Sequence, residues 1–310
     1  MRQTALDVVT EMARRDPRVV FIGSDLGAGT MDAFRTEMPD RFFMEGVSEQ
    51  NIVGVAAGLA MDGFIPFVNT IATFLTRRCF EQVAVDLCLH NLPVRLIANG
   101  GGVVYAPLGP THLAIEDFGI LRTLPNMTIV APSDAKEMRR TIPATLYQPG
   151  PIYIRLGKGG DPVIARDDEH FEIGKAIVKR RGADVGLIST GVMTERCLQA
   201  AEKLSGLGMA AGVLHCHTVK PLDAEAVCAF SRNVRLLVTV EEHLPTGGLG
   251  SAVIDTLLAA GERLQPILRL ALPDRFPTNY GSQDDLLGLA GLQPDSIAQR
   301  VAERFKEIRT

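Results

Sequence analysis

Three polar segments of this sequence carry side chains that could move protons or hold an anion. Glu49 opens a small-residue helix predicted over 50–62, and a helix N-terminus favours a negative charge. His112 ends a Gly-Pro-Thr-His turn, and histidine is suited to acid–base work near neutral pH. Arg155 and Lys158 lie at the end of a predicted strand and could bind a phosphate or another anion. Each segment also has a plainer interpretation: a helix-start acid, a histidine that only hydrogen-bonds, and solvated basic residues.

Alternating strands and helices are predicted to position these residues. The strands are expected at 19–25, 65–70, 93–99, 127–133 and 151–156, and the helices over 50–62, 74–90, 113–124 and 134–147. This alternation predicts a mostly parallel sheet covered by helices on both faces, which is the α/β class. In such sheets ligands bind at the carboxyl ends of the strands, where the three segments lie.

A second α/β series follows a break rich in glycine and charge. Its strands are expected at 184–191, 210–219, 235–243 and 267–273, and its helices over 192–206, 222–230, 247–260 and 283–308. The sequence therefore predicts two domains, at 1–165 and 184–310, joined by a linker at 166–183.

Composition excludes several classes of function. The chain has 310 residues, 46% of them hydrophobic and 22% charged, with a formal net charge of −4, so no basic surface points to nucleic acid. No apolar run approaches the ~20 residues that span a bilayer, and the N-terminus lacks the apolar centre of a signal peptide. The five cysteines include no Cys-x-x-Cys pair, which argues against a disulfide framework or a zinc site. A cytoplasmic protein is expected.

The stretch that begins at Glu49 resembles the transketolase family. Glu-Gln followed by Asn-Ile-Val-Gly-Val-Ala-Ala-Gly-Leu-Ala over 49–60 is similar to the transketolase and deoxyxylulose-phosphate synthase stretch in which a glutamate precedes a Gly/Ala-rich helix. The resemblance implies thiamine diphosphate as cofactor. It also implies that Glu49 hydrogen-bonds N1′ of the cofactor's aminopyrimidine and activates it.

A second segment resembles the wall of the aminopyrimidine pocket in this family. Phe74, in Thr-Phe-Leu over 73–75, matches an aromatic residue of that wall directly. Phe80 falls where transketolases have a tyrosine. Arg77 falls where transketolases have another aromatic residue and the synthases an arginine. The resemblance implies that these three side chains hold the cofactor, although two aromatic residues six apart are also compatible with a plain core role.

The resemblance also suggests which residues face the substrate. In the family the histidine of Gly-Pro-Thr-His lines the substrate channel and assists proton transfer, which is the role implied for His112. Lys158 takes the place of a synthase arginine that binds the substrate phosphate, and Arg155 lies close by in sequence. Leu108 stands where transketolases have an acidic residue just before this turn, so ordinary pentose phosphates are not the expected substrates.

The second half resembles the C-terminal domain shared by transketolases, the synthases and beta subunits of 2-oxoacid dehydrogenases, through Val-Glu-Glu-His over 240–243 and Gly-Gly-Leu-Gly over 247–250. The family's Gly-Asp-Gly…Asn motif, which binds Mg²⁺ and the diphosphate, does not occur in this sequence. No metal ligand is therefore predicted on this chain. An N-terminal-type partner subunit is expected to carry the motif and Mg²⁺, in an α₂β₂ heterotetramer.

The sequence thus predicts the C-terminal subunit of a two-chain thiamine diphosphate transketolase. It would transfer a ketol unit from a ketose donor to an aldose acceptor, with sugars or sugar phosphates as substrates. A beta subunit of a 2-oxoacid dehydrogenase and a synthase-like enzyme are alternatives, and Gly-Pro-Thr-His favours the transketolase. A non-catalytic partner subunit is a third, against which the acid at Glu49 argues.

Overall fold

Seven strands form the first sheet in the computed structural model, which describes residues 1–24, 29–157 and 159–308. Within those residues the strand order is β10-β5-β6-β4-β3-β1-β2, and every neighbouring pair is parallel except β10 with β5. The strands are β1 (Val19–Ser24), β2 (Phe42–Glu45), β3 (Ile65–Ile71), β4 (Arg95–Asn99), β5 (Thr128–Val130), β6 (Ile152–Leu156) and β10 (Thr218–Lys220). The interior strands are buried along most or all of their length, which explains their nearly continuous apolar sequence.

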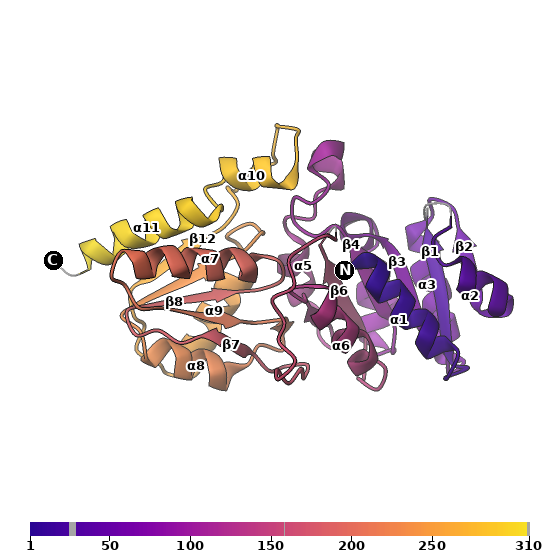
Figure 1. The fold of residues 1–310 in the computed structure, drawn as a ribbon. Helices are drawn as coiled ribbons and strands as arrows, with labels where there is room; N and C mark the ends of the chain where they lie inside the picture. The colour runs from indigo at the N-terminus through magenta and orange to yellow at the C-terminus, as the bar shows by residue number, and fades with distance from the viewer. Residues whose placement is uncertain (25–28, 158, 309–310) are drawn as a thin grey trace.

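Helices cover both faces of this sheet (Figure 1). One apolar core joins the sheet to α1 (Arg2–Ala13), α2 (Asp32–Glu37) and α6 (Ala135–Thr145). Another joins it to α3 (Glu49–Met61), α5 (Asp117–Arg122) and the helical stretch from Phe74 to Leu89. That stretch is α4 (Phe80–Gln82) flanked by the π-helical segments Phe74–Arg78 and Val83–Leu89, and π-helical segments often occur at functional sites.

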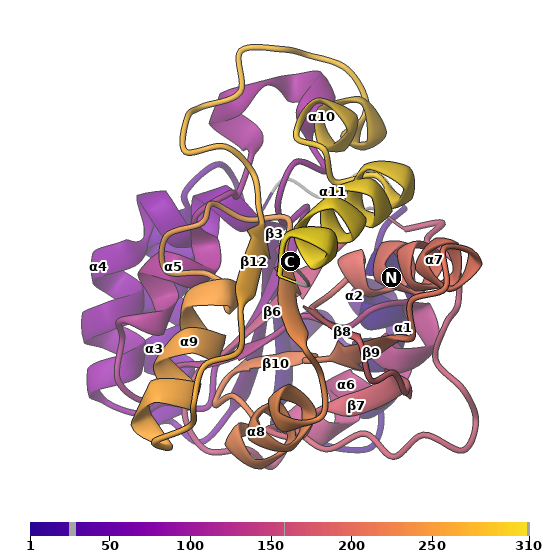
Figure 2. The same cartoon turned by 90° about the vertical axis from the view of Figure 1, so that its left-hand side faces the viewer.

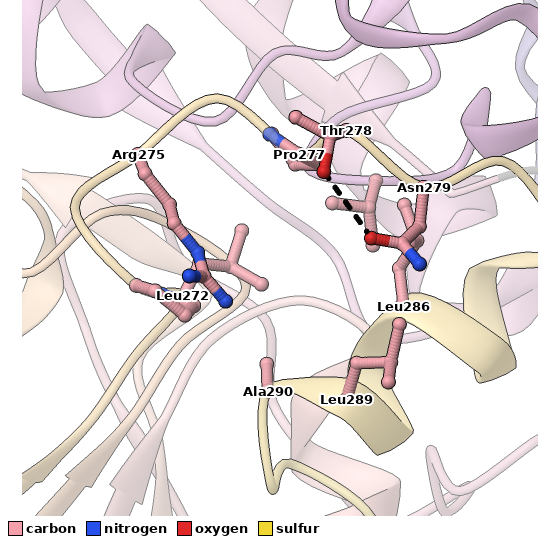
Figure 3. Close-up of a pocket in the computed structure, with 10 residues that line it drawn as sticks. Leu272, Arg275, Pro277, Thr278, Asn279, Leu286, Leu289 and Ala290 are labelled. Carbon is pink, nitrogen blue, oxygen red and sulfur yellow. Dashed lines mark hydrogen bonds between the residues drawn. The ribbon is translucent and has the colours of Figure 1, made fainter.

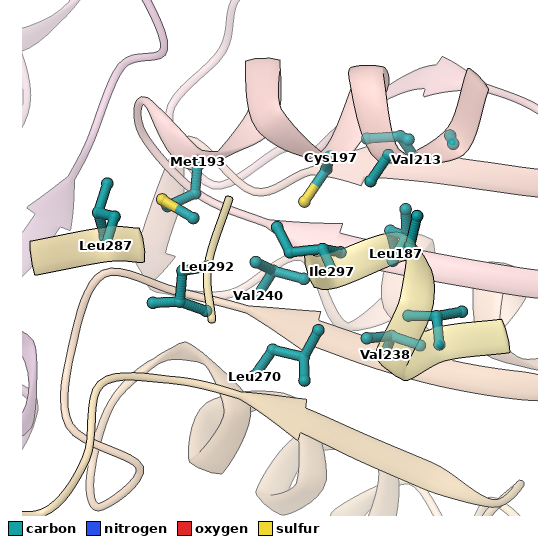
Figure 4. Packing of buried hydrophobic residues seen from close by; sticks show 14 of the residues in the cluster. Leu187, Met193, Cys197, Val213, Val238, Val240, Leu270, Leu287, Leu292 and Ile297 are labelled. Atoms are coloured by element: carbon teal, nitrogen blue, oxygen red, sulfur yellow. The ribbon is translucent and has the colours of Figure 1, made fainter. Parts of the chain in front are cut away.

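The second sheet has the order β12-β11-β8-β9-β7 among the described residues. Its strands are β7 (Ile177–Arg180), β8 (Val185–Ser189), β9 (Ala211–His215), β11 (Leu236–Val240) and β12 (Ile267–Leu270). Only β7, which lies inside the predicted linker, pairs antiparallel. One face packs against α7 (Met193–Gly206), α10 (Gln283–Leu289) and α11 (Pro294–Glu307), with the core shown in Figure 4. The other packs against α8 (Ala224–Arg232) and α9 (Leu249–Ala259).

The predicted α/β class with two mostly parallel sheets is confirmed, and two local expectations are corrected. The single strand expected over 210–219 is divided into β9 and β10, because the chain leaves the second sheet after His215 and adds β10 to the edge of the first. The helix expected over 113–124 is the shorter α5, because Ala114 instead pairs with Gly102 as an isolated antiparallel bridge. The short strand β2 was not expected from the sequence, because its four residues are only partly buried or exposed and form no apolar run.

The two domains meet along the carboxyl edge of the first sheet. In Figure 2 the loop before α10 lies beside the magenta segment that precedes α5. These are the chain around 276–282 from the second domain and the Gly-Pro-Thr-His region of the first. No helix within the described residues is long and apolar enough to cross a membrane.

Candidate active site at the carboxyl edge of the first sheet

Glu49 is the first residue of α3 and follows the short turn after β2. Only 2% of its surface is exposed. Burying a carboxylate is costly unless it is hydrogen-bonded or paired. Here the Arg78 Nη1 donates to Glu49 Oε2, and the two form an ion pair. The N-terminus of α3 adds a favourable field. A buried, paired acid at a strand's carboxyl edge is suited to proton chemistry on a bound ligand.

Phe74 and His112 lie beside this pair. The Arg78 guanidinium carbon stands 4.3 Å from the centroid of the Phe74 ring, and the His112 ring meets Phe74 edge-on, with 5.3 Å between centroids. The His112 Nδ1 lies 2.9 Å from the Thr111 hydroxyl, which orients the imidazole. The structure therefore brings three predicted site residues, Glu49, Phe74 and His112, into one cluster.

Arg77 borders this cluster and ties it to the second domain. Its guanidinium forms an ion pair with Glu116 and donates to the Pro110 carbonyl at 3.3 Å. The guanidinium carbon also lies 5.6 Å from the ring centroid of Phe276. Phe80, on the following turn, is 37% exposed. The cofactor contacts predicted for Arg77 and Phe80 stay predictions, and the predicted Lys158 lies outside the described residues.

The second domain contributes aromatic side chains to the rim of the site. Phe276 and Tyr280 are both largely exposed, and Tyr280 covers Gly109 of the Gly-Pro-Thr-His turn. A β-carbon at Gly109 would lie 2.8 Å from the Tyr280 ring, and the residue has φ +78°. The backbone conformation favours glycine at this position, and a larger residue would also push the exposed Tyr280 ring aside.

Arg155 is buried behind the loop that carries His112. Its Nε pairs with Asp117 at 3.0 Å, and its Nη2 donates to the carbonyls of Ala114 at 3.0 Å and Glu242 at 2.8 Å. Its guanidinium carbon also lies 4.3 Å from the ring centroid of Phe118. These contacts connect the two domains. The predicted binding of an anion by Arg155 stays a prediction.

A separate cavity of about 130 Å³ lies between α10 and the loop that follows β12 (Figure 3). Arg275, Thr278 and Asn279 line it together with apolar residues, and none of the predicted site residues does. Among the described residues, no three His, Cys, Asp or Glu side chains come together in a way that could hold a metal ion.

Sequence reasoning missed the partners of the site residues. Arg78 is the direct partner of Glu49, and Glu116 that of Arg77. Glu242 and Tyr280 approach from a domain more than 100 residues downstream. Two patterns in the sequence could have indicated these partners: the consecutive Arg77 and Arg78 shortly after Phe74, and the Glu-Glu-His run over 241–243 after a buried strand. Charged residues that are buried or partly buried usually need a partner.

The structure thus has two α/β domains in tandem, with a buried acid, an aromatic ring and a histidine gathered at the carboxyl edge of the first sheet. Residues 1–160 match the family model described as transketolase, pyrimidine binding domain. Residues 174–297 match transketolase, C-terminal domain. The chain belongs to the transketolase family, as its sequence predicted.

Similar proteins include subunits of divided transketolases. A 6-deoxy-6-sulfo-D-fructose transketolase subunit of Clostridium sp. strain MSTE9 is 38% identical, over 98% of this chain and 95% of its own length. One subunit of the apulose-4-phosphate transketolase of Phocaeicola vulgatus is 35% identical, over 99% of this chain and 97% of its own length. A solved structure described as a split gene transketolase, inactive β4 tetramer, is 35% identical with a TM-score of 0.90, covering 98% of each chain.

Proposed function

We propose that this chain is the C-terminal subunit of a two-chain transketolase that moves a ketol unit from a ketose donor to an aldose acceptor. The observation that carries the proposal is the buried Glu49 beside Phe74 and His112, at the edge of a transketolase pyrimidine-binding domain. The relatives that match this chain along nearly their full length are transketolase subunits, so the 2-oxoacid dehydrogenase alternative is not favoured.

The site suits the aminopyrimidine of thiamine diphosphate, and Arg78 shows why. Its planar guanidinium stacks over Phe74 and donates to the Glu49 carboxylate. An aminopyrimidine could make the same two contacts, because it has a flat ring that can stack on Phe74 and a ring nitrogen that can hydrogen-bond to Glu49. Thiamine diphosphate, when bound, supplies the electron sink of the reaction.

The side chains of this subunit have separable roles in the proposal. Glu49 holds and exchanges a proton with the aminopyrimidine, and Phe74 fixes the plane of that ring, with Phe80 and Arg77 at its border. His112 holds and moves protons at the substrate oxygens. Lys158 and Arg155 remain the proposed ligands for an anionic end of the substrate.

The proposal includes a partner subunit of the N-terminal type in an α₂β₂ heterotetramer. That partner would carry Gly-Asp-Gly…Asn, Mg²⁺ and the diphosphate site, since these hard oxygen ligands suit Mg²⁺. The similar split-gene protein, described as inactive when it is a β4 tetramer, supports both self-association and partner dependence. A cytoplasmic location completes the proposal.

Isotopic labelling tests the reaction class. The reconstituted two-chain enzyme is given a ketose labelled at C1 and C2, together with an unlabelled aldose. Ketol transfer predicts a new ketose that contains both labelled carbons, and an aldose two carbons shorter than the donor. Release of CO₂ from a 2-oxoacid, with no such transfer from any ketose in a donor screen, would contradict the proposal.

Arg78→Ala is expected to strengthen thiamine diphosphate binding. In this proposal the cofactor ring displaces the Arg78 guanidinium, whose side chain is 41% exposed and so borders solvent. An ion pair of this partly exposed kind is worth about 1 kcal/mol, so the Kd of the two-chain complex should fall about fivefold. Calorimetry measures this Kd without turnover. Arg14→Ala, which removes a surface ion pair with Glu37, is the matched control, and an unchanged or raised Kd for Arg78→Ala would refute the displacement.

A further inference from the structure

The loop that carries His112 is closed at its base by a two-residue bridge. The Gly102 N–H donates to the Ala114 carbonyl at 2.9 Å, and the Ala114 N–H donates to the Gly102 carbonyl at 3.0 Å. The chain between them runs out to the Gly-Pro-Thr-His turn and back. His112 lies only two residues from the bridge, so its position depends on how firmly this base is held.

Glu242, from the second domain, holds one side of the base. Its Oε1 accepts the Val103 N–H at 2.8 Å, and its two oxygens lie 2.9 and 3.0 Å from Gln283 Nε2 at the start of α10. The residue is only 3% exposed. A β-carbon at Gly102 would lie 2.3 Å from the Glu242 carboxyl carbon, and Gly102 has φ +63°. A larger residue at position 102 would therefore displace the Glu242 carboxylate from the base of the loop and strain the backbone.

Arg155 ties the other side of the base to the same residue. Its Nη2 donates both to the Ala114 carbonyl and to the Glu242 backbone carbonyl. Burial raises the pKa of the Glu242 carboxyl, and the neighbouring Arg155 charge lowers it. Glu242 is thus connected to both sides of the bridge. Its carboxylate accepts from Val103 on one side, and its backbone carbonyl is linked through Arg155 to Ala114 on the other.

We propose that Glu242 is a positioning residue for His112, through which the C-terminal domain fixes the geometry of the active-site loop. Glu242 contacts the base of this loop and not Phe74 or Glu49. Loss of its carboxylate therefore frees the loop while leaving the aminopyrimidine pocket formed. A shift of about 1 Å in a reacting group can cost about a hundredfold in rate.

Glu241 provides a matched control in the adjacent position. It is also buried, but its oxygens accept the N–H groups of Leu249 and Gly250 at the start of α9, within its own domain. Glu241→Ala and Glu242→Ala both remove a buried carboxylate from the same segment. A general loss of stability should appear in both variants, and a loss of loop position only in the second.

Hydrogen–deuterium exchange tests the contact independently of any activity. In the full chain, peptides covering 100–114 are expected to exchange at least about tenfold faster in Glu242→Ala, with no such change in Glu241→Ala. Glu242→Gln keeps an acceptor for the Val103 N–H and should exchange nearly as slowly as the wild type. Equal exchange in all four proteins would overturn the proposal.

A double-mutant cycle in the two-chain enzyme tests the link to His112, which rests on the proposed function. Glu242→Ala should lower kcat about 10- to 100-fold while the Kd for thiamine diphosphate stays within about twofold. In a His112→Ala background the same change should cost less than about threefold, because residues that act as a unit are not additive. If the loss of kcat in the double variant equals the product of the losses in the two single variants, Glu242 does not act through His112 and the positioning role is overturned. Absence of ketol transfer in the wild-type complex would instead refute the proposed function, and the exchange result would still decide the contact.

Discussion

Glu49→Gln is expected to lower kcat of the two-chain enzyme at least about a thousandfold. Proton transfer by a positioned acid or base contributes about 10²–10⁴-fold, and the amide cannot exchange a proton with the aminopyrimidine. Glutamine has nearly the same shape, so the 2% exposed site at the start of α3 remains filled. The measurement is single-turnover and steady-state kinetics at saturating cofactor, with thermal unfolding to confirm the fold.

Glu81→Gln is the matched control for this change. Glu81 is an exposed acid of α4, in the helical stretch that carries Phe74, so its substitution should leave kcat within about twofold, as is usual for surface changes. If the Glu49 variant kept more than about a tenth of the wild-type turnover, this chain would be a structural partner and not a catalytic one. That result would revive the non-catalytic alternative.

Arg155→Met should destabilise the folded chain by about 3–5 kcal/mol, the cost of leaving one member of a buried ion pair uncompensated. Asp117 is fully buried, forms an ion pair with Arg155 at 3.0 Å and accepts a hydrogen bond from the Tyr153 hydroxyl at 2.8 Å. Without the guanidinium, the Asp117 carboxylate loses its ion-pair partner, and the Ala114 and Glu242 carbonyls lose their donor. Denaturant unfolding of the isolated chain measures the effect.

The double variant Arg155→Met/Asp117→Leu should recover at least half of that loss, because replacing both partners with apolar residues removes the unpaired charge. This also separates two roles for Arg155. If its main role is to bind an anionic substrate, the single variant raises KM for the donor while the free energy of unfolding changes by less than about 1 kcal/mol. That outcome would contradict a structural role for Arg155 at the domain contact.

The local sequence pattern was sufficient to predict the fold class and the clustering of Glu49, Phe74 and His112. Continuous apolar strands and intervening amphipathic helices specify a parallel sheet, and the chain order then places Glu49, Phe74 and His112 after successive strands of one edge. The resemblance in residue types around Glu49 supplied the chemistry.

Long-range pairing explains what the sequence did not reveal. β10 has three residues and belongs to the first sheet only because it meets β5, which no local propensity encodes. Residues 113–116 were expected to be helical, but Ala114 instead pairs with Gly102 and its carbonyl accepts from Arg155. Glu242 itself lies 139 residues from its partner Val103, so only the folded chain shows that a residue of the second domain contacts the base of the loop that carries His112.

The proposed role of this chain, as the aminopyrimidine-binding half of a transketolase, is tested most directly by measuring ketol transfer in three samples. These are this chain alone, an N-terminal-type subunit alone, and the two mixed, each with thiamine diphosphate and Mg²⁺. Turnover is expected only in the mixture, rising with added partner to saturation near a 1:1 ratio. Turnover by this chain alone, or none in the mixture with any ketose donor, would contradict that role.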